Sequence, residues 1–318
     1  MKLSVVVPCY NEQDNIAPLF DAVQMAFAAL PVEIDKYELV FVNDGSKDET
    51  RARLLTLHAA YPATTAVVDF SRNFGKEAAV LAGLRRAGGD LVAIMDADLQ
   101  QRPEMVVDMV RYLCDHPDTD MVAAYQENRI EGKTLTFFKK MFYKIVNWMC
   151  EIPFRKDASD FRTFRKNVRD AVLSLPEYDR FSKGIFSWVG FPTHYMPYTA
   201  APRHAGSTKW SFFKLLKYAV TGIISYTTTP LRISTFLGLG VSFASVIYLI
   251  VTVVQKLCFG VDVPGYATIV GLILLLGGIQ LLMLGVMGEY LAKAYMQGKG
   301  RPVYIERQYL PAKDDENA

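Results

Sequence analysis

Two carboxylates at the end of a short apolar run are the residues of this chain best placed to do chemistry. Residues 91–95 are apolar and lead directly into Asp96 and Asp98. Such a run predicts a buried strand of a parallel sheet, and ligands bind just beyond the carboxyl ends of such strands. Because neighbouring carboxylates repel one another, we expect a cation beside them. Mg²⁺ suits one or two carboxylates together with substrate phosphates. The alternative is an Asp pair that caps the following helix.

Polar residues follow other apolar runs in the same way. Residues 8–12 follow the run 3–7, and Asp44, Gly45 and Ser46 follow the run 37–43. Asp-Gly-Ser is also a common turn sequence, so a purely structural role is the alternative there. Lys76 comes directly after a glycine, and its ammonium group could meet a diphosphate. It could equally be a solvated charge at the start of a helix.

The elements that must position these residues alternate along the chain. Apolar runs predict strands at 3–7, 37–43, 65–70, 91–95 and 121–124, and helical spacing predicts helices at 16–30, 48–60, 77–87 and from 103 onward. Strands that alternate with helices predict an α/β fold with a mostly parallel sheet and helices on both of its faces. The carboxyl ends of its strands then bring the polar residues together.

The last third of the chain has a different character. Residues 233–255 and 263–288 contain no Lys, Arg, Asp, Glu or His. Each stretch reaches the about 20 residues that cross a bilayer core, and the short connector between them predicts a transmembrane hairpin. Lysine and arginine residues flank the outer ends of the pair. The positive-inside rule therefore predicts a protein of the cell (inner) membrane with both termini on the cytoplasmic side.

Two further segments are amphipathic. Residues 135–150 fit either a core helix or a helix on a bilayer, whereas basic and aromatic residues at 210–221 favour an interfacial helix. We therefore expect four parts: a catalytic domain at 1–208, an interfacial region at 209–231, the hairpin at 232–292 and a cytoplasmic tail at 293–318.

Three motifs occur in order after separate predicted strands: residues 5–12 (VVVPCYNE), 42–46 (VNDGS) and 96–100 (DADLQ). Together they resemble family 2 glycosyltransferases of the GT-A (Rossmann-like) fold. Residues 203–210 (RHAGSTKW), the hairpin and residues 288–305 narrow the resemblance to polyprenyl-phosphate glycosyltransferases, most like the bactoprenol (undecaprenyl-phosphate) glucosyltransferase group. The resemblance covers about residues 2–305.

The resemblance implies roles for the residues on the donor side. Asp98 and Asp96 are expected to bind Mg²⁺ or Mn²⁺. Asp98 and Gln100 are expected to act in catalysis, with Gln100 within reach of the sugar or the acceptor. Residues 101 and 102 depart from the Asp-Pro that the group often has there, since this chain has Gln101 and Arg102. The residues expected to bind the nucleotide sugar are Pro8, Tyr10, Asn11, Glu12, Asp44, Ser46, Lys76 and Asp96.

The residues on the acceptor side allow more than one role. The resemblance implies a catalytic base, for which we choose Asp157, with Asp160 as the alternative. A phosphate monoester is already largely ionised at neutral pH, so such a carboxylate could instead orient the acceptor. Asp160 and Arg162 could also form a structural ion pair, and the cations of 203–209 could close over the donor or attract anionic lipid. The expected acceptor-binding residues are Arg155, Arg162, Arg203, Ser207 and Lys209.

We therefore expect an inverting transfer of glucose from UDP-glucose to undecaprenyl phosphate. The alternatives are another donor (GDP-mannose, UDP-N-acetylglucosamine or UDP-aminoarabinose) or a catalytically silent membrane scaffold. A net charge of +2 argues against a nucleic-acid partner. The four scattered cysteines argue against a zinc site or a disulfide framework. Glycines in both apolar stretches permit a homo-oligomer such as a tetramer.

Overall fold

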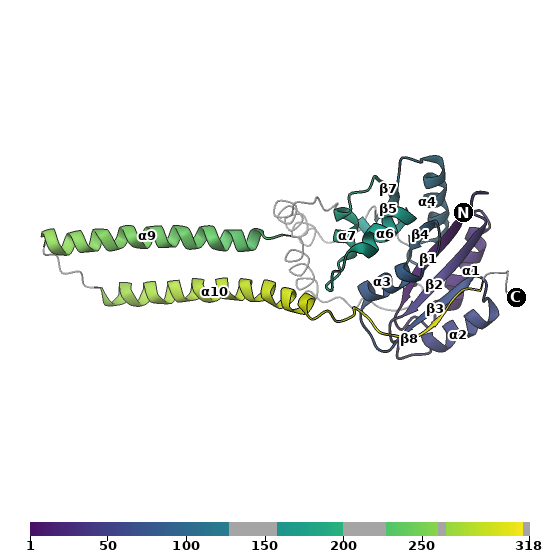
Figure 1. Cartoon of the computed structure of the whole chain (residues 1–318), viewed down its shortest axis with the longest axis horizontal. Coiled ribbons are helices and arrows are strands. Elements are labelled where there is room, and N and C mark those ends of the chain that lie inside the picture. The colour runs from purple at the N-terminus through teal and green to yellow at the C-terminus, as the bar shows by residue number, and fades with distance from the viewer. Residues whose placement is uncertain (127–157, 200–226, 260–264, 314–318) are drawn as a thin grey trace. The chain divides into compact units, whose positions relative to one another are not determined.

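The computed structural model describes residues 1–126, 158–199, 227–259 and 265–313 (Figure 1). The chain divides into two compact units. The first consists of residues 1–145, 152–211 and 301–318, and the second consists of residues 146–151 and 212–300. We call them the sheet unit and the hairpin unit. The two amphipathic segments expected at 135–150 and 210–221 lie outside the described residues.

The sheet unit contains an eight-stranded sheet among its described residues, in the order β7-β5-β6-β4-β1-β2-β3-β8. Its centre, β4-β1-β2-β3, is parallel. Strand β6 is antiparallel to both β4 and β5, and β8 is antiparallel to β3. The strands are β1 (Lys2–Cys9), β2 (Lys36–Asn43), β3 (Thr65–Phe70), β4 (Leu91–Ile94), β5 (Met121–Gln126), β6 (Ala158–Arg165), β7 (Thr193–Tyr198) and β8 (Glu306–Leu310).

Helices cover both faces of the central strands. Alternate residues of β1 separate the faces, because Leu3, Val5 and Val7 join one apolar cluster while Val6 points to the other side. Helices α1, α2 and α4 pack on the first face, and α3 packs on the second. The helices of this unit are α1 (Ile16–Phe27), α2 (Thr50–Ala60), α3 (Lys76–Arg86), α4 (Pro103–Asp115), α6 (Lys166–Ser174) and α7 (Ser182–Trp188).

The predicted α/β fold with a mostly parallel sheet is confirmed, and all five predicted strands are present with small changes at their ends. Strands β6, β7 and β8 were not predicted. The last of them changes the expected organisation, since the predicted tail at 293–318 contains the final turns of α10 and then β8, which joins the sheet. These residues form a strand because β3 offers them an unpaired edge.

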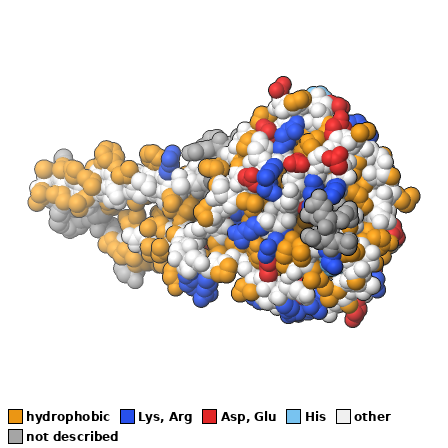
Figure 2. All heavy atoms as spheres, turned by 45° about the vertical axis from the view of Figure 1, so that its right-hand side comes forward, with side chains coloured by type: hydrophobic (Ala, Val, Ile, Leu, Met, Phe, Trp, Pro, Cys, Tyr) orange, Lys and Arg blue, Asp and Glu red, His pale blue; other side chains and the backbone are white. Residues whose placement is uncertain are grey.

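The hairpin unit contains α9 (Thr229–Phe259) and α10 (Tyr266–Gly298). Both are long and apolar enough to cross a membrane, and no residue in the most apolar stretch of either helix is buried within the protein. Figure 2 shows apolar side chains over the visible surface of these helices. Exposed apolar surface of this extent is unfavourable in water and favourable in hydrocarbon. The two apolar helices predicted from the sequence are therefore present.

Candidate active site

The loops that follow β1 and β2 meet at the carboxyl end of the parallel sheet. Strands β1 and β2 pair in register up to Cys9 and Asn43, so the residues after them emerge side by side. The backbone amide of Asn11 donates to Ser46 Oγ at 3.0 Å, and the backbone amide of Lys47 donates to Asn11 Oδ1 at 2.9 Å. Two expected donor-site residues, Asn11 and Ser46, are thus held against each other.

The rest of the first motif lies in the same loop. Pro8 is in β1 near its end, Tyr10 follows the strand, and both are partly exposed. The Glu12 amide donates to Thr50 Oγ1 at 2.8 Å, and the Glu12 carboxylate accepts a 2.6 Å hydrogen bond from Asn15 Nδ2. Glu12 thus ties this loop to the starts of α1 and α2.

Asp44 is directed at a third loop, residues 71–75. Its carboxylate accepts hydrogen bonds from the amides of Phe74 (2.6 Å) and Gly75 (2.9 Å) and from Asn73 Nδ2 (2.9 Å). Burial raises the pKa of Asp44 above its ordinary value, against the opposing effect of these hydrogen bonds. Asp44 therefore orders the loop that leads into α3. Its contact with a nucleotide stays a prediction.

Gly45 explains why the turn after β2 can approach this loop. Its φ is +60°, and a Cβ there would lie 2.3 Å from the carbonyl carbon of Arg72. Only glycine adopts that conformation without strain and fits the space. The Asp-Gly-Ser sequence is therefore both a turn and a contact surface.

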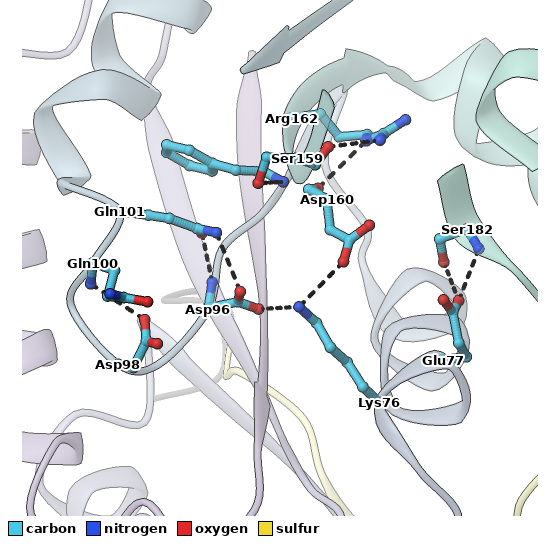
Figure 3. A network of polar contacts seen from close by, with 11 residues as sticks. Lys76, Glu77, Asp96, Asp98, Gln100, Gln101, Ser159, Asp160, Arg162 and Ser182 are labelled. Carbon is cyan, nitrogen blue, oxygen red and sulfur yellow. Dashed lines mark hydrogen bonds and ion pairs between the residues drawn. The ribbon is translucent and has the colours of Figure 1, made fainter. Parts of the chain in front are cut away.

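Lys76, at the first turn of α3, joins two carboxylates from separate strands (Figure 3). Its Nζ lies 2.6 Å from Asp96 Oδ1 and 3.3 Å from Asp160 Oδ2. Burial lowers the pKa of Lys76, but the two carboxylates outweigh that effect and raise it above its ordinary value. The cation expected beside Asp96 is thus supplied by the chain itself.

Asp160, the alternative in the sequence prediction, lies in β6 at this cluster. Burial would raise its pKa, but the nearby Lys76, Lys183 and Arg162 lower the pKa of Asp160 to about 2. Its Oδ1 is buried and has no hydrogen-bond partner among the described residues. Asp160 is therefore ionised at neutral pH, and only its Oδ2 contacts Lys76.

The loop after β4 carries both predicted carboxylates. Asp96 exchanges two hydrogen bonds with Gln101, through its amide to Oε1 (2.8 Å) and through Oδ2 from Nε2 (3.2 Å). The Gln100 amide donates to Asp98 Oδ1 at 3.2 Å. Gln101 thus orients the Asp96 carboxylate, a role that was not predicted from the sequence. It occupies one of the two positions at which this chain differs from the Asp-Pro that is frequent in the group.

Glu77, the next residue of α3, anchors a helix that the sequence analysis missed. Its Oε2 accepts hydrogen bonds from both the amide (2.9 Å) and the hydroxyl of Ser182, at the start of α7. Burial and the Asp160 charge raise the pKa of Glu77, and these bonds oppose that rise. The pair Lys76 and Glu77 thereby joins α3 to β4, β6 and α7. In the sequence, the only sign of this role of Lys76 and Glu77 was that two charged residues stand side by side at the start of a predicted helix.

Arg162 is buried rather than open to a ligand. It is 4% exposed, stacks on Phe186 at 4.3 Å and donates to the Ser159 carbonyl at 2.9 Å. Its expected binding of the acceptor stays a prediction. Asp157, Arg155, Arg203, Ser207 and Lys209 lie outside the described residues.

The residues present fit a divalent cation that is shared with a phosphate ligand. No group of three His, Cys, Asp or Glu residues that could hold an ion alone occurs in the described part of the chain. Asp96 already attracts a cation, Lys76, and Oδ1 of Asp160 is a buried acceptor with no hydrogen-bond partner among the described residues. An ion here would need phosphate oxygens to complete its ligands, as Mg²⁺ commonly does.

Carboxylates and a lysine lie at the carboxyl ends of the central parallel strands, which is where α/β proteins with open sheets bind their ligands. The family model described as glycosyl transferase family 2 matches residues 4–172, and a model described as the GtrB C-terminal hairpin matches residues 229–294. The chain belongs to glycosyl transferase family 2, and its sheet unit has the GT-A fold.

Similar proteins share nearly the whole chain. An uncharacterized glycosyltransferase from Synechocystis sp. is 40% identical and covers 98% of both chains. The bactoprenol glucosyl transferase of Shigella phage SfV is 38% identical over 96% of this chain and 98% of its own. Among solved structures, glucosyl-3-phosphoglycerate synthase from Mycobacterium tuberculosis with Mn²⁺, UDP and phosphoglyceric acid is 19% identical, with a TM-score of 0.48 over 70% of this chain and 76% of its own.

Proposed function

We propose that this protein transfers glucose from UDP-glucose to undecaprenyl phosphate at the surface of a membrane. The observation that carries the proposal is the extent of the likeness to the phage bactoprenol glucosyl transferase, which includes both the sheet unit and the two apolar helices. An enzyme with a lipid-borne acceptor needs both parts. The cluster of Lys76, Asp96 and Asp160 supplies suitable chemistry at the end of the sheet.

Lys76 is the residue that responds to the donor. Its ammonium group is held by two carboxylates, and a diphosphate would offer it a stronger acceptor. Positive charge aimed at the departing nucleoside diphosphate stabilises the transition state as negative charge develops on the leaving oxygen. Asp44 and Gly45 contribute indirectly, because they fix the loop that leads into α3 and Lys76.

Asp98 and Asp96 are the residues that would hold Mg²⁺ or Mn²⁺ together with the donor. When bound, the ion supplies Lewis-acid stabilisation of the diphosphate. Gln101 holds the Asp96 carboxylate from the side opposite Lys76, so Asp96 keeps its orientation when its cation changes.

The acceptor phosphate needs little help from a base. Its second pKa is about 6, so its oxygen is already largely ionised at neutral pH. Asp160, whose pKa is held at about 2 by neighbouring cations, is also a poor proton acceptor. We assign Asp160 an electrostatic role toward Lys76. Asp157 keeps the predicted role of base or acceptor-orienting group.

The hairpin unit supplies the membrane side of the proposal. We place α9 and α10 across the inner membrane, with the sheet unit and both termini in the cytoplasm, as the positive-inside rule indicates. The domain boundaries expected from the sequence at 208, 231 and 292 stay part of this proposal, although α10 continues to Gly298 and β8 joins the sheet. A homo-oligomer, for instance a tetramer, remains part of the proposal through the glycines of the two spans.

The test uses the purified full-length protein in detergent with undecaprenyl phosphate and either Mg²⁺ or Mn²⁺. Labelled UDP-glucose, GDP-mannose, UDP-N-acetylglucosamine and UDP-aminoarabinose are offered in separate reactions, and label in the lipid fraction is measured. We expect transfer from UDP-glucose. Transfer from another donor alone would overturn the assigned sugar, and no transfer from any donor would favour the silent scaffold.

A further inference from the structure

The chain that leaves α10 returns to the sheet unit and becomes part of it. After α10 ends at Gly298, residues 303–310 cross the β3 edge, and we call them the C-terminal strap. Tyr304 within it is 8% exposed and belongs to the apolar cluster beneath α3. Figure 1 shows β8, in yellow, lying along β3.

The main chain of the strap reaches the first residue of the 71–75 loop. The Ser71 amide donates to the Ile305 carbonyl at 3.0 Å, and Arg307 Nη2 donates to the Ser71 carbonyl at 3.4 Å. Both polar groups of the Ser71 backbone are therefore held by the strap, just where β3 ends and the loop begins.

Aromatic rings extend the contact into the middle of that loop. Tyr304 stacks on Phe70 with ring centroids 4.9 Å apart and an interplanar angle of 16°. Phe70 in turn meets Phe74 edge to face at 5.7 Å. The Phe74 amide donates to Asp44, so the stack ends at the hydrogen bonds that order the approach to Lys76.

A buried carboxylate carries a second connection. Asp69 of β3 is 2% exposed and accepts from Asn43 Nδ2 at 2.7 Å and from Arg51 Nε at 2.8 Å, while Arg307 Nη1 of the strap lies 3.9 Å from its Oδ2. Asn43 Oδ1 accepts from the Ser46 amide at 3.2 Å. The strap is thereby joined through Asp69 and Asn43 to the turn after β2.

We propose that the C-terminal strap positions the 71–75 loop and the 44–46 turn, with Tyr304 and Arg307 as its positioning residues. The donor side of the site is then complete only when the chain leaving the second membrane helix has paired with β3. Simple protection of an open edge would require only the β8 ladder, whereas the contacts of Tyr304 and Ser71 lie beyond that ladder. The inference rests on the proposed function only in taking this loop as part of the donor site.

The experiment compares the full-length protein in detergent with Tyr304→Ala and Tyr304→Phe. Hydrogen exchange is followed in peptides that cover residues 71–76, and the KM for UDP-glucose is measured against kcat. For Tyr304→Ala we expect faster exchange in 71–76 and a KM raised up to about tenfold, the value of one aromatic contact, with a smaller change in kcat. Tyr304→Phe keeps the ring, so it should restore both readouts.

Tyr61→Ala is the control for the loss of an aromatic contact elsewhere in the unit, at a ring that is 43% exposed where Tyr304 is 8% exposed. It removes a ring contact of the same unit, with Phe20 at 4.5 Å, near the opposite end of β3. If Tyr304→Ala and Tyr61→Ala change exchange in 71–76 and the KM equally, the strap only stabilises the unit and the proposal is wrong. Arg307→Gln, at an exposed residue, serves if Tyr304→Ala does not fold, and the same two readouts decide. Exchange reports on the strap even if no donor is turned over.

Discussion

The ammonium group of Lys76 partly neutralises the carboxylates of Asp96 and Asp160. One carboxylate in the loop after β4 and one in β6 face the same ammonium group at 2.6 and 3.3 Å. Without that ammonium they would repel one another, and the pKa of at least one would rise. In the proposed function, Lys76 therefore supplies one positive charge that is already in place for the donor phosphates.

The first prediction concerns the acid stability of this charged cluster. A carboxyl whose pKa is lowered by folding stabilises the protein above its unfolded pKa and loses that contribution as the pH falls toward the folded pKa. For Asp160 this window runs from the ordinary value of 3.8 down to about 2. Asp160→Asn should cost about 2 kcal/mol at pH 7 and about half as much at pH 3. Denaturant unfolding at the two pH values measures it, and a cost independent of pH would contradict it.

The second prediction concerns Asp98. Substitution of groups that merely support a metal ligand costs about 10- to 100-fold in activity, so loss of a direct ligand should cost about 100-fold or more. We expect Asp98→Ala to lose metal-dependent transfer to this extent while it keeps its melting temperature. Asp118→Ala, at an exposed position of the same unit, is the control. Normal turnover of Asp98→Ala with Mg²⁺ or Mn²⁺ would remove Asp98 from the metal site.

At the scale of elements, α3 is the helix on which the site depends. It presents Lys76 and Glu77 at its start and packs against β1 and β2 through small residues. Gly83 marks the closest approach, since a Cβ there would lie 2.2 Å from Val6 Cγ1. Val6 is fully buried, so it has little room to move.

The third prediction follows from that packing. Alanine is favoured over glycine inside a helix by about 1 kcal/mol, yet Gly83→Ala should lower the free energy of unfolding by about 1 to 3 kcal/mol because of overpacking. Val6→Ala should relieve the clash, so the double variant should be no less stable than Val6→Ala alone. A double-mutant cycle of unfolding free energies measures this coupling. A more stable Gly83→Ala would show that the helix shifts freely on the sheet.

The elements also explain what the sequence could predict. Residues 91–94 are apolar throughout, and that local pattern alone identifies β4 and the carboxylates that follow it. Strand β6 has polar residues at several positions and becomes a strand through pairing with β4 and β5. The choice of Asp157 over Asp160 had no local signal to guide it, because Lys76 is distant in sequence. Likewise β8 needs the β3 edge, which no pattern within residues 306–310 reveals.

At the scale of the whole molecule, the chain runs from the sheet unit through two apolar helices and back to the sheet unit. This path has a topological consequence. Under the membrane-spanning proposal, the first helix follows the sheet unit and β8 rejoins that unit, so the proposal places the two outer ends of the hairpin on the same side of the membrane. The membrane-spanning proposal therefore has to place the connector between the helices on the other side.

The fourth prediction tests that placement with cysteines already in the chain. Cys258 is exposed near the end of α9, beside the connector, whereas Cys114 lies in α4 of the sheet unit and is partly exposed. In right-side-out membrane vesicles, a membrane-impermeant maleimide should label Cys258, and Cys114 should react only after detergent is added. Cys258→Ser should remove the first signal and leave the second. Labelling of Cys114 in sealed vesicles would invert the proposed orientation, because the catalytic unit would then face away from the cytoplasmic pool of nucleotide sugar.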